Sequence, residues 1–387
     1  MLKIRSKVSV LRTARLVCLA LVAIWLVGCT DKSATGPTSS ASATSAENPV
    51  KIYKWRLVTT WPKNLPGVGT GPERMADAIR EMSAGRLDIT VYGAGELVPA
   101  LGVFDAVSLG NVEMGHGAAY YWKGKLPAAQ FFTTVPFGLT AQEMNGWLQH
   151  GGGMALWEEL YAPYDLIPMA GGNTGVQMAG WFNKEINSLD DLRGLKMRIP
   201  GMGGEVFERA GGTAINIAAG EIFTSLQTGN IDAAEWVGPY NDLSFGLYQA
   251  ARYYYYPGWQ EPGPALEVIV NKAAMESLPS DLQAILRSAA ATMNADMLAE
   301  YTARSDGALA ELVNNHQVQL RRLPDDVLAR LQEISNEMVK DIAGDDALAQ
   351  RIYTSFEAYQ TQVTHYHEIS ERAYINARTG QKTAPGS

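Results

Sequence analysis

Both cysteines of the 387-residue chain, Cys18 and Cys29, lie in its first 29 residues. The long remainder holds no thiol, so its fold can use neither a disulfide nor a cysteine-ligated metal site. A chain of this length buries enough apolar surface to fold without such cross-links. We therefore expect ordinary core packing, divided between lobes, to hold the body together.

The N-terminus has the layout of an export signal. Basic residues at positions 3, 5, 7, 12 and 15 precede an apolar run from Leu16 to Val27, and no acid occurs before Asp31. The run is too short to cross a bilayer, which takes about 20 residues. A basic start followed by a short apolar stretch is typical of a signal peptide, and we predict one over residues 1–28.

The apolar run ends in Gly28-Cys29, which resembles a bacterial lipobox. In that motif the signal is cut before the cysteine, and lipid is attached to Cys29. An ordinary signal peptide that is cleaved nearby is the alternative. Residues 30–49 are mostly Ser, Thr, Ala and Gly, with no large apolar side chains, and such segments do not build a core. We predict a lipidated flexible tether over 29–49 that anchors the protein to a membrane.

The charge balance argues against a nucleic-acid partner. The whole chain has a net charge of −8, and removal of a leader that carries five basic residues and no acid makes it −13. Nucleic-acid binding depends on basic patches. An anionic small ligand is compatible with this charge, because one local arginine can outweigh a distant net charge.

Two stretches of the chain alternate strand-like and helix-like segments. In residues 50–175, strands are predicted from Tyr53, at 87–92 and at 111–117, with helices from Pro72 and at 103–109. A second series over 176–270 includes predicted strands at 196–199 and 231–237. This order favours parallel sheets flanked by helices. We predict an α/β protein with lobe I over 50–175, lobe II over 176–270 and a cleft between them.

The C-terminal region, 271–387, is predicted to be helical and to span the lobes. Residues 281–315 contain one glycine and no proline, and 324–342 and 345–378 are also helical by pattern. Within the last segment an apolar stripe recurs at steps of three and four residues: Ile352, Phe356, Tyr359 and Val363. Packing on the protein's own core and packing on a second subunit both explain this stripe.

Enzymatic signatures are scarce. The sequence has no G-x-S-x-G, P-loop or H-E-x-x-H motif, and its five histidines lack metal-ligand spacing. What it does have is a set of polar residues near the ends of predicted strands in the second series: Gln177, Arg198, Glu235, Trp236, Gln260 and Glu261. Ligands of open α/β sheets bind at the carboxyl ends of strands. A surface charge or a loop cap explains each residue alone, but their convergence at one end favours a ligand site.

Two long stretches, Ile186 to Pro200 and Glu221 to Glu235, resemble the hallmark segments of TRAP-transporter periplasmic solute-binding proteins. Shorter stretches resemble the branch of that family that binds 2-oxo acids with a metal ion: 59–63, 93–99, 118–122, 235–240 and 256–263. The resemblance covers residues 55–373. It implies a periplasmic-binding-protein architecture, a location in the periplasm, no catalysis, and delivery of the ligand to membrane permease subunits.

The same resemblance implies a site, residue by residue. Arg198 matches the arginine that pairs with the ligand carboxylate, and its planar fork suits bidentate recognition. Glu235, Glu261 and the main-chain carbonyl of Trp236 match metal ligands, and Gln177 matches a glutamine in the ligand and metal site. Lobe I would add a contact from Tyr120 or Tyr121. The implied substrate-binding set is therefore Gln177, Arg198, Tyr120, Tyr121 and Trp236, and the metal set is Gln177, Glu235, Trp236 and Glu261.

A cation would explain why two acids lie near an anionic ligand, which they would otherwise repel. An oxygen-only donor set suits a hard ion, and the family precedent is sodium, or calcium in some relatives. Pairing of Glu235 and Glu261 with arginines is the alternative. We expect the ligand to be a 2-oxo or 2-hydroxy monocarboxylate such as pyruvate or lactate, and the resemblance also implies a homodimer formed through a C-terminal helix.

Two other functions are compatible with the sequence. In the first, the protein is an exported, metal-assisted enzyme that acts on organic acids, with Glu235 and Glu261 as acid and base. In the second, it reports its ligand to a receptor rather than to a transporter.

Overall fold

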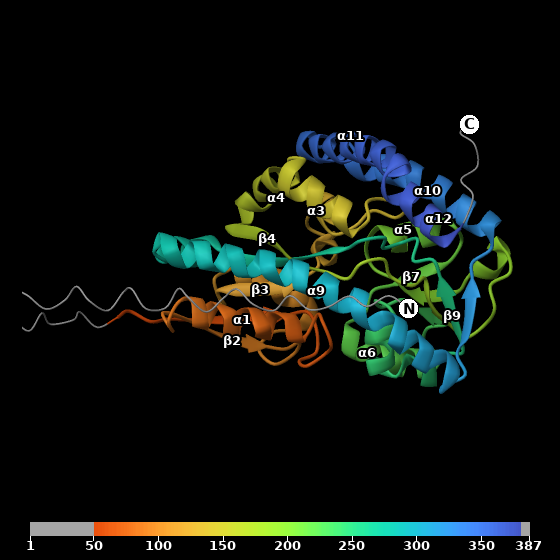
Figure 1. Cartoon of the computed structure of the whole chain (residues 1–387), viewed down its shortest axis with the longest axis horizontal. Coiled ribbons are helices and arrows are strands. Elements are labelled where there is room, and N and C mark those ends of the chain that lie inside the picture. Colours follow the sequence, from red (N-terminus) through yellow and green to blue (C-terminus); the bar gives the residue numbers. More distant parts are fainter. Residues whose placement is uncertain (1–49, 381–387) are drawn as a thin grey trace, which may run out of the picture. The chain divides into compact units, whose positions relative to one another are not determined.

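The computed structural model describes residues 50–380 (Figure 1). The predicted signal peptide, the tether and Cys29 lie outside these residues, as does the end of the chain after residue 380. Across the described part, no helix combines the length and apolar character that crossing a membrane requires.

The first sheet has five strands in the order β2-β1-β3-β10-β4. Its parallel part consists of β1 (Tyr53–Thr59), β2 (Leu87–Tyr92) and β3 (Met114–Gly117). The crossovers contain α1 (Thr70–Met82) and α2 (Val103–Ser108), so the βαβαβ order predicted from the sequence is confirmed. The remaining strands, β4 (Leu166–Asn173) and β10 (Ala265–Asn271), are antiparallel to each other, and β10 is antiparallel to β3.

The second sheet has six strands in the order β11-β9-β5-β8-β6-β7. Its strands are short: β5 (Gly180–Phe182), β6 (Lys196–Arg198), β7 (Thr213–Ile215), β8 (Ala233–Ala234), β9 (Tyr253–Tyr256) and β11 (Gln319–Arg322). The helices among them are α5 (Gly201–Arg209), α6 (Ala219–Gln227) and α7 (Pro239–Phe245). Ser188 caps a 3-10 turn, η5 (Leu189–Leu192), with Asp191 completing a capping box. Two sheets of this kind make the predicted α/β architecture of two lobes.

The chain passes between the two sheets more often than the predicted boundaries of lobes I and II imply. Residues 265–271 were assigned to lobe II as far as 270, but as β10 they run in the first sheet between β3 and β4. All seven β10 residues are buried, and an apolar run of this kind shows that a strand is buried but not which sheet it joins. Likewise β11, from the region predicted as helical, pairs in parallel with β9 at the edge of the second sheet.

Helices make up most of the rest of the chain. Between β3 and β4 lie α3 (Ala141–His150) and α4 (Gly153–Tyr161), and the C-terminal region contains α8 (Lys272–Ser277), α9 (Ser280–Asn314), α10 (Asp325–Ala343), α11 (Ala347–Ile369) and α12 (Glu371–Thr379). The other 3-10 turns are η1 (Ala100–Gly102), η2 (Ala119–Trp122), η3 (Pro127–Phe132), η4 (Ala162–Tyr164) and η6 (Leu247–Gln249).

The long helix α9 packs against both lobes. It packs on α1 and β4 of the first lobe and on α7 of the second, and Figure 1 shows it running past both sheets. The apolar stripe on α11 packs on the protein's own core: Ile352 and Phe356 are fully buried, and the Phe356 ring lies against Phe131 and Trp147. Core packing therefore explains the buried part of that stripe.

A buried acid lies at the centre of the first lobe. The Glu267 carboxylate, on β10, accepts hydrogen bonds from the Trp122 indole and from the Tyr161 hydroxyl, the latter at 2.8 Å. Burial raises the pKa of Glu267 to about 7, although both hydrogen bonds oppose the shift. Since Trp122 follows Tyr120 and Tyr121 in η2, this acid holds the turn that carries them.

We predict that Glu267→Gln flattens the pH dependence of stability. A glutamate with a folded-state pKa near 7 and an unfolded value of 4.5 supports the fold below pH 4.5 and loses that contribution as pH rises through 7. Urea unfolding should show that the wild type loses about 3 kcal/mol relative to the variant between pH 4.5 and pH 8. Glu276→Gln, at an exposed position, is the control. Parallel pH profiles for wild type and Glu267→Gln would contradict the assignment.

Candidate functional site

Arg198 is the centre of the candidate site, and strand pairing places it there. It ends β6, whose parallel neighbour β8 ends next to Glu235, with Arg198 opposite Ala234. The guanidinium Nη1 donates to the Glu235 carbonyl oxygen at 3.0 Å and to the Glu235 carboxylate. Its Nη2 lies 3.3 Å from the Tyr121 hydroxyl, which comes from the other lobe. Arg198 and Glu235 are essentially inaccessible, with side chains 1% and 0% exposed.

The guanidinium is charged in this setting. Burial alone would lower the pKa of Arg198, but the charge of Glu235, together with Tyr121, Tyr120 and Glu261, raises it above its ordinary value. The Trp236 ring adds a cation–π contact, with its centroid 5.2 Å from the guanidinium carbon. Arg198 is therefore a fixed positive charge with one side committed to Glu235.

A second buried acid lies beside this pair. Glu261 is buried, and its main-chain carbonyl accepts a hydrogen bond from the Gln177 amide at 3.1 Å. Burial and the nearby charge of Glu235 raise the pKa of Glu261 well above its usual value, and the Tyr120 hydroxyl opposes the shift. Burial likewise raises the pKa of Glu235 to about 7, against the effect of Arg198. The positive charge of one guanidinium therefore does not offset the cost of keeping two buried carboxylates ionised.

Unpartnered oxygens show what the site lacks. Among the buried side-chain atoms of the described residues that have no hydrogen-bond partner are Gln177 Oε1, Glu235 Oε2 and Glu261 Oε2, together with Arg198 Nε. Three oxygens, two of them from carboxylates, suit a hard cation such as sodium or calcium. Within residues 50–380 no group of three or more His, Cys, Asp or Glu side chains is arranged to hold a metal ion. A cation here therefore needs amide and carbonyl oxygens as well, and the residues present fit that donor set.

The residues that the sequence singled out lie in this region: Gln177, Arg198, Glu235, Trp236, Gln260 and Glu261 from the second-lobe side, and Tyr120 and Tyr121 from the first. The pattern alone did not identify Trp61 and His116 of the first lobe. The Trp61 indole donates to His116 Nδ1 at 2.7 Å, and its ring lies edge-on to Trp236, with centroids 6.1 Å apart. Trp61 falls within the 59–63 stretch that carries the resemblance, but nothing in the sequence indicated that its ring meets Trp236.

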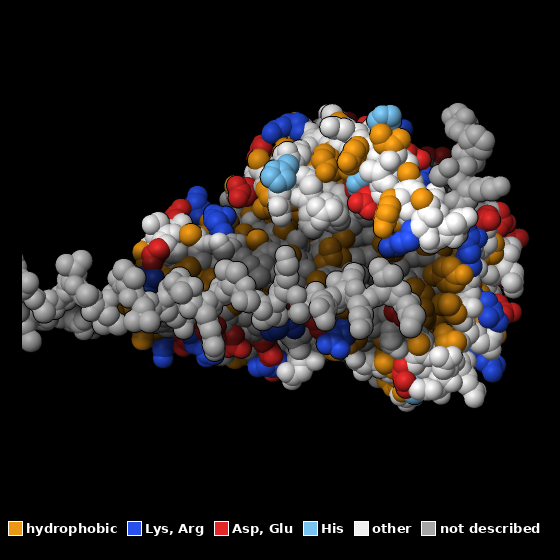
Figure 2. Space-filling model, in the orientation of Figure 1, with side chains coloured by type: hydrophobic (Ala, Val, Ile, Leu, Met, Phe, Trp, Pro, Cys, Tyr) orange, Lys and Arg blue, Asp and Glu red, His pale blue; other side chains and the backbone are white. Residues whose placement is uncertain are grey.

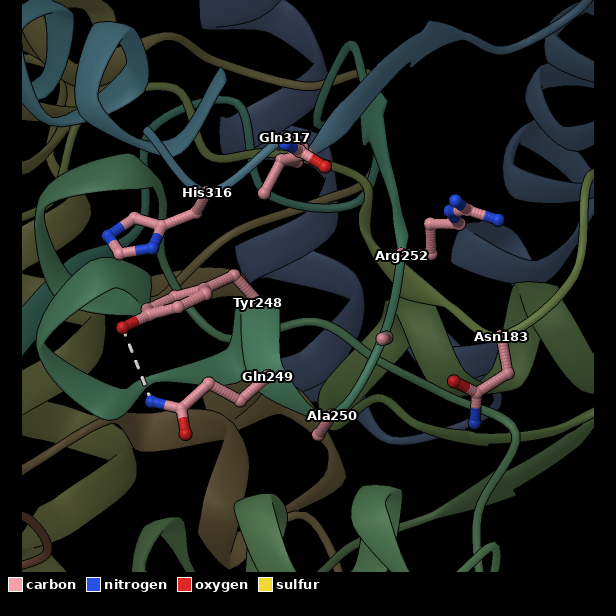
Figure 3. Close-up of a pocket in the computed structure, with 9 residues that line it drawn as sticks. Asn183, Tyr248, Gln249, Ala250, Arg252, His316 and Gln317 are labelled. Atoms are coloured by element: carbon pink, nitrogen blue, oxygen red, sulfur yellow. Dashed lines mark hydrogen bonds between the residues drawn. The ribbon is translucent and has the colours of Figure 1, made fainter. Parts of the chain in front are cut away.

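Two cavities lie in the described part of the chain, and none of the predicted site residues lines either of them. One of about 490 Å³ is lined by first-lobe residues, including Pro62 and Leu101, and by second-lobe residues, including Asn216 and Glu221. Its lining therefore comes from both lobes. Another of about 410 Å³ is lined by Tyr248, Arg252 and His316 (Figure 3) and contains none of the predicted site residues. This second cavity lies where β9 and β11 begin.

Comparison with known proteins decides the family. Residues 57–346 match the model of the bacterial extracellular solute-binding proteins, family 7. The chain belongs to this family. It is a family of TRAP-transporter periplasmic solute-binding proteins, which confirms the resemblance found in the sequence and supports the solute-binding hypothesis over the enzyme hypothesis.

Relatives of this family member have known ligands. It is 43% identical to the monocarboxylate 2-oxoacid-binding periplasmic protein of Nostoc sp. strain PCC 7120, over 89% of this chain and 95% of that protein. A TRAP solute-binding protein from Pseudoalteromonas atlantica, solved with sodium and pyruvate, is 44% identical over 84% of this chain and 99% of that one, with a TM-score of 0.82. A homologue from Colwellia psychrerythraea, solved with calcium and pyruvate, has the same identity, coverage of this chain and TM-score, with 100% of that chain covered.

We predict that Glu261→Gln stabilises the cation-free protein and weakens its response to calcium. The change removes one of two buried carboxylates, so less repulsion remains when no cation is present. Thermal unfolding at pH 8 should give a higher Tm than wild type in a chelator and a much smaller rise on addition of calcium. Glu205→Gln, which removes the partner of the part-exposed Lys123, should respond to calcium like wild type. An unchanged calcium response in Glu261→Gln would contradict the assignment.

Proposed function

We propose that this protein binds a small 2-oxo or 2-hydroxy monocarboxylate, pyruvate- or lactate-like, together with a sodium or calcium ion, and presents it to the membrane subunits of a TRAP transporter. The observation that carries the proposal is the combination of one buried guanidinium with a free Nε and three buried oxygens without partners. A bound anion would accept a hydrogen bond from the free Nε–H, and a cation bound beside it would be coordinated by the three oxygens. The pyruvate-bound relatives support the ligand class.

The free edge of Arg198 indicates how the carboxylate binds. Because Nη1 already donates to Glu235, the ligand approaches the edge formed by Nε and Nη2. That edge offers two parallel N–H donors, which match the two oxygens of a carboxylate. Tyr121, 3.3 Å from Nη2, brings the first lobe to the same edge, so ligand binding favours contact between the lobes.

The cation would be held by Gln177, Glu235, Glu261 and the Trp236 carbonyl, and it would supply the positive charge that lets two carboxylates lie beside an anion. These acids then act as ligands of the ion and not as an acid–base pair. The keto or hydroxy oxygen next to the ligand carboxylate is the chemical group that distinguishes a 2-oxo or 2-hydroxy acid from a simple carboxylic acid. We infer that this oxygen faces the same donor set.

We predict that Arg198→Lys weakens binding of pyruvate by about 10- to 100-fold, because a lysine keeps the charge but cannot offer two parallel donors. Isothermal titration calorimetry in sodium or calcium buffer measures the change. The control is Arg209→Lys, whose guanidinium forms an exposed ion pair with Asp341. The proposal fails if Arg198→Lys binds pyruvate as tightly as wild type.

We also propose that two copies associate through the C-terminal helices. Apolar side chains near the end of α11 and on α12 are exposed, with Ile369 74% and Tyr374 64% accessible. Figure 2 shows apolar side chains gathered on the side where these helices lie. Exposed apolar faces of this kind commonly mark protein interfaces.

Sedimentation velocity should give a dimer for wild type and a shift towards monomer for Ile369→Asp. A monomeric wild type at micromolar concentration would rule out the proposed dimer.

Tethering to the membrane through lipid on Cys29 belongs to the same proposal. Its support is the placement of Gly28-Cys29 at the end of an apolar run. Labelled palmitate should enter the wild-type protein in bacterial cells and not a Cys29→Ser variant, and labelling of both would refute it.

A further inference from the structure

A loop of the first lobe reaches across to the candidate cation site. Residues 61–69 follow β1 and fold into a series of turns, with Gly67 in the left-handed region at φ +68°. A Cβ at Gly67 would lie 2.5 Å from the Tyr301 ring, so the loop is packed tightly on α9. The Pro66 carbonyl oxygen accepts one hydrogen bond from the Tyr301 hydroxyl at 3.2 Å and a second from Asn241 Nδ2 at 2.7 Å.

Asn241 is the second-lobe end of this contact. It lies in the first turn of α7 and is fully buried. Its Oδ1 accepts a hydrogen bond from the Trp236 indole at 3.2 Å. The Asn241 carboxamide thus donates to the first lobe and accepts from the Trp236 indole. Trp236 is also the residue whose main-chain carbonyl is proposed as a ligand of the cation.

The next residue fixes the backbone on the far side of Trp236. The buried Asp242 carboxylate accepts from the Gly238 amide at 3.1 Å and from the Val237 amide at 3.4 Å. It also accepts from the Trp181 indole at 2.9 Å and the Tyr254 hydroxyl at 2.7 Å. Since Trp181 and Tyr254 lie on β5 and β9, Asp242 ties residues 237–238 to the second sheet. Asn241 is the neighbouring group that ties the same segment to the other lobe.

We propose that Asn241 is a positioning residue that couples closure of loop 61–69 to formation of the cation site at Trp236. This inference rests on the proposed function for its ligand, but the contact itself is independent of which ligand binds. When the lobes approach, Pro66 meets the carboxamide. The carboxamide in turn orients the Trp236 indole, which contacts both the Arg198 guanidinium and the Trp61 ring. When the lobes separate, the carboxamide loses its first-lobe partner and the Trp236 segment loses its restraint from that lobe.

Asn241→Asp tests the coupling, because an aspartate still accepts from the Trp236 indole but meets the Pro66 carbonyl with an oxygen instead of an N–H. Asn294→Asp is the matched control. Asn294 is also a buried asparagine that uses both ends of its carboxamide, accepting from the Gly172 amide at 3.3 Å and donating to Asn145 at 2.8 Å. All of its partners lie in the first lobe or on α9, away from the cation site.

The first measurement needs no ligand. Hydrogen–deuterium exchange of the purified protein should be about tenfold faster in peptides covering 61–69 and 235–239 for Asn241→Asp than for wild type. Asn294→Asp should leave these two peptides unchanged. The coupling is wrong if only one of the two peptides changes, or if Asn294→Asp and Asn241→Asp change them equally. Asn241→Ser, which adds no charge, gives the same test if the aspartate variant does not fold.

The second measurement separates this proposal from the function. Calorimetric titration of calcium in the presence of pyruvate should show about tenfold weaker calcium binding for Asn241→Asp and wild-type binding for Asn294→Asp. Wild-type calcium affinity in Asn241→Asp, alongside faster exchange, would overturn the link to the cation site. Absence of pyruvate binding in the wild-type protein would instead count against the proposed function, and the exchange result would still decide the coupling between loop and Trp236.

Discussion

The site depends on the burial of two carboxylates beside one guanidinium. Removal of charges from water is costly, and a buried pair repays that cost only when its remaining hydrogen-bonding groups are also satisfied. Here Arg198 and Glu235 form the pair, and Glu261 is a further acid with no cationic partner of its own. The raised pKa values of both glutamates express this imbalance. A bound cation would add the positive charge that the two carboxylates lack. With that charge present, an anionic ligand could bind beside the carboxylates without being repelled.

The fold supplies this arrangement from segments that are distant in sequence. Parallel pairing of β6 and β8 sets Arg198 next to Glu235, and the backbone bond from Gln177 to the Glu261 carbonyl brings in two more members. The first lobe contributes Tyr121 at the guanidinium and the 61–69 loop at Trp236. The long helix α9 contacts both lobes, so the groups that must meet around a ligand are carried on a shared support. Binding and closure are therefore expected to be linked events.

Much of this was accessible from the sequence because it depends on local pattern. Alternating apolar residues, and glycines at the ends of helices, predicted the βαβαβ order of the first lobe. The ends of predicted strands indicated Arg198, Glu235 and Glu261. The strand ends also gave Gln177 and Trp236, and the resemblance added their roles and the tyrosines of η2. Chain crossings were missed, since nothing in residues 265–271 states that they return to the first sheet. Asn241 was missed for a related reason: its partner Pro66 is 175 residues away. An asparagine at the start of a helix resembles an ordinary capping residue until the tertiary contact is known.

We propose that the anion and the cation bind to one site and that each increases the affinity for the other. Calorimetric titration of pyruvate into the protein, first with sodium or calcium and then in potassium buffer with a chelator, tests it most directly. We expect clear binding in the first buffer and little or none in the second, with an equal and reciprocal gain in cation affinity when pyruvate is present. Equal pyruvate affinity in both buffers would show that the two glutamates need no ion and that anion and cation bind independently.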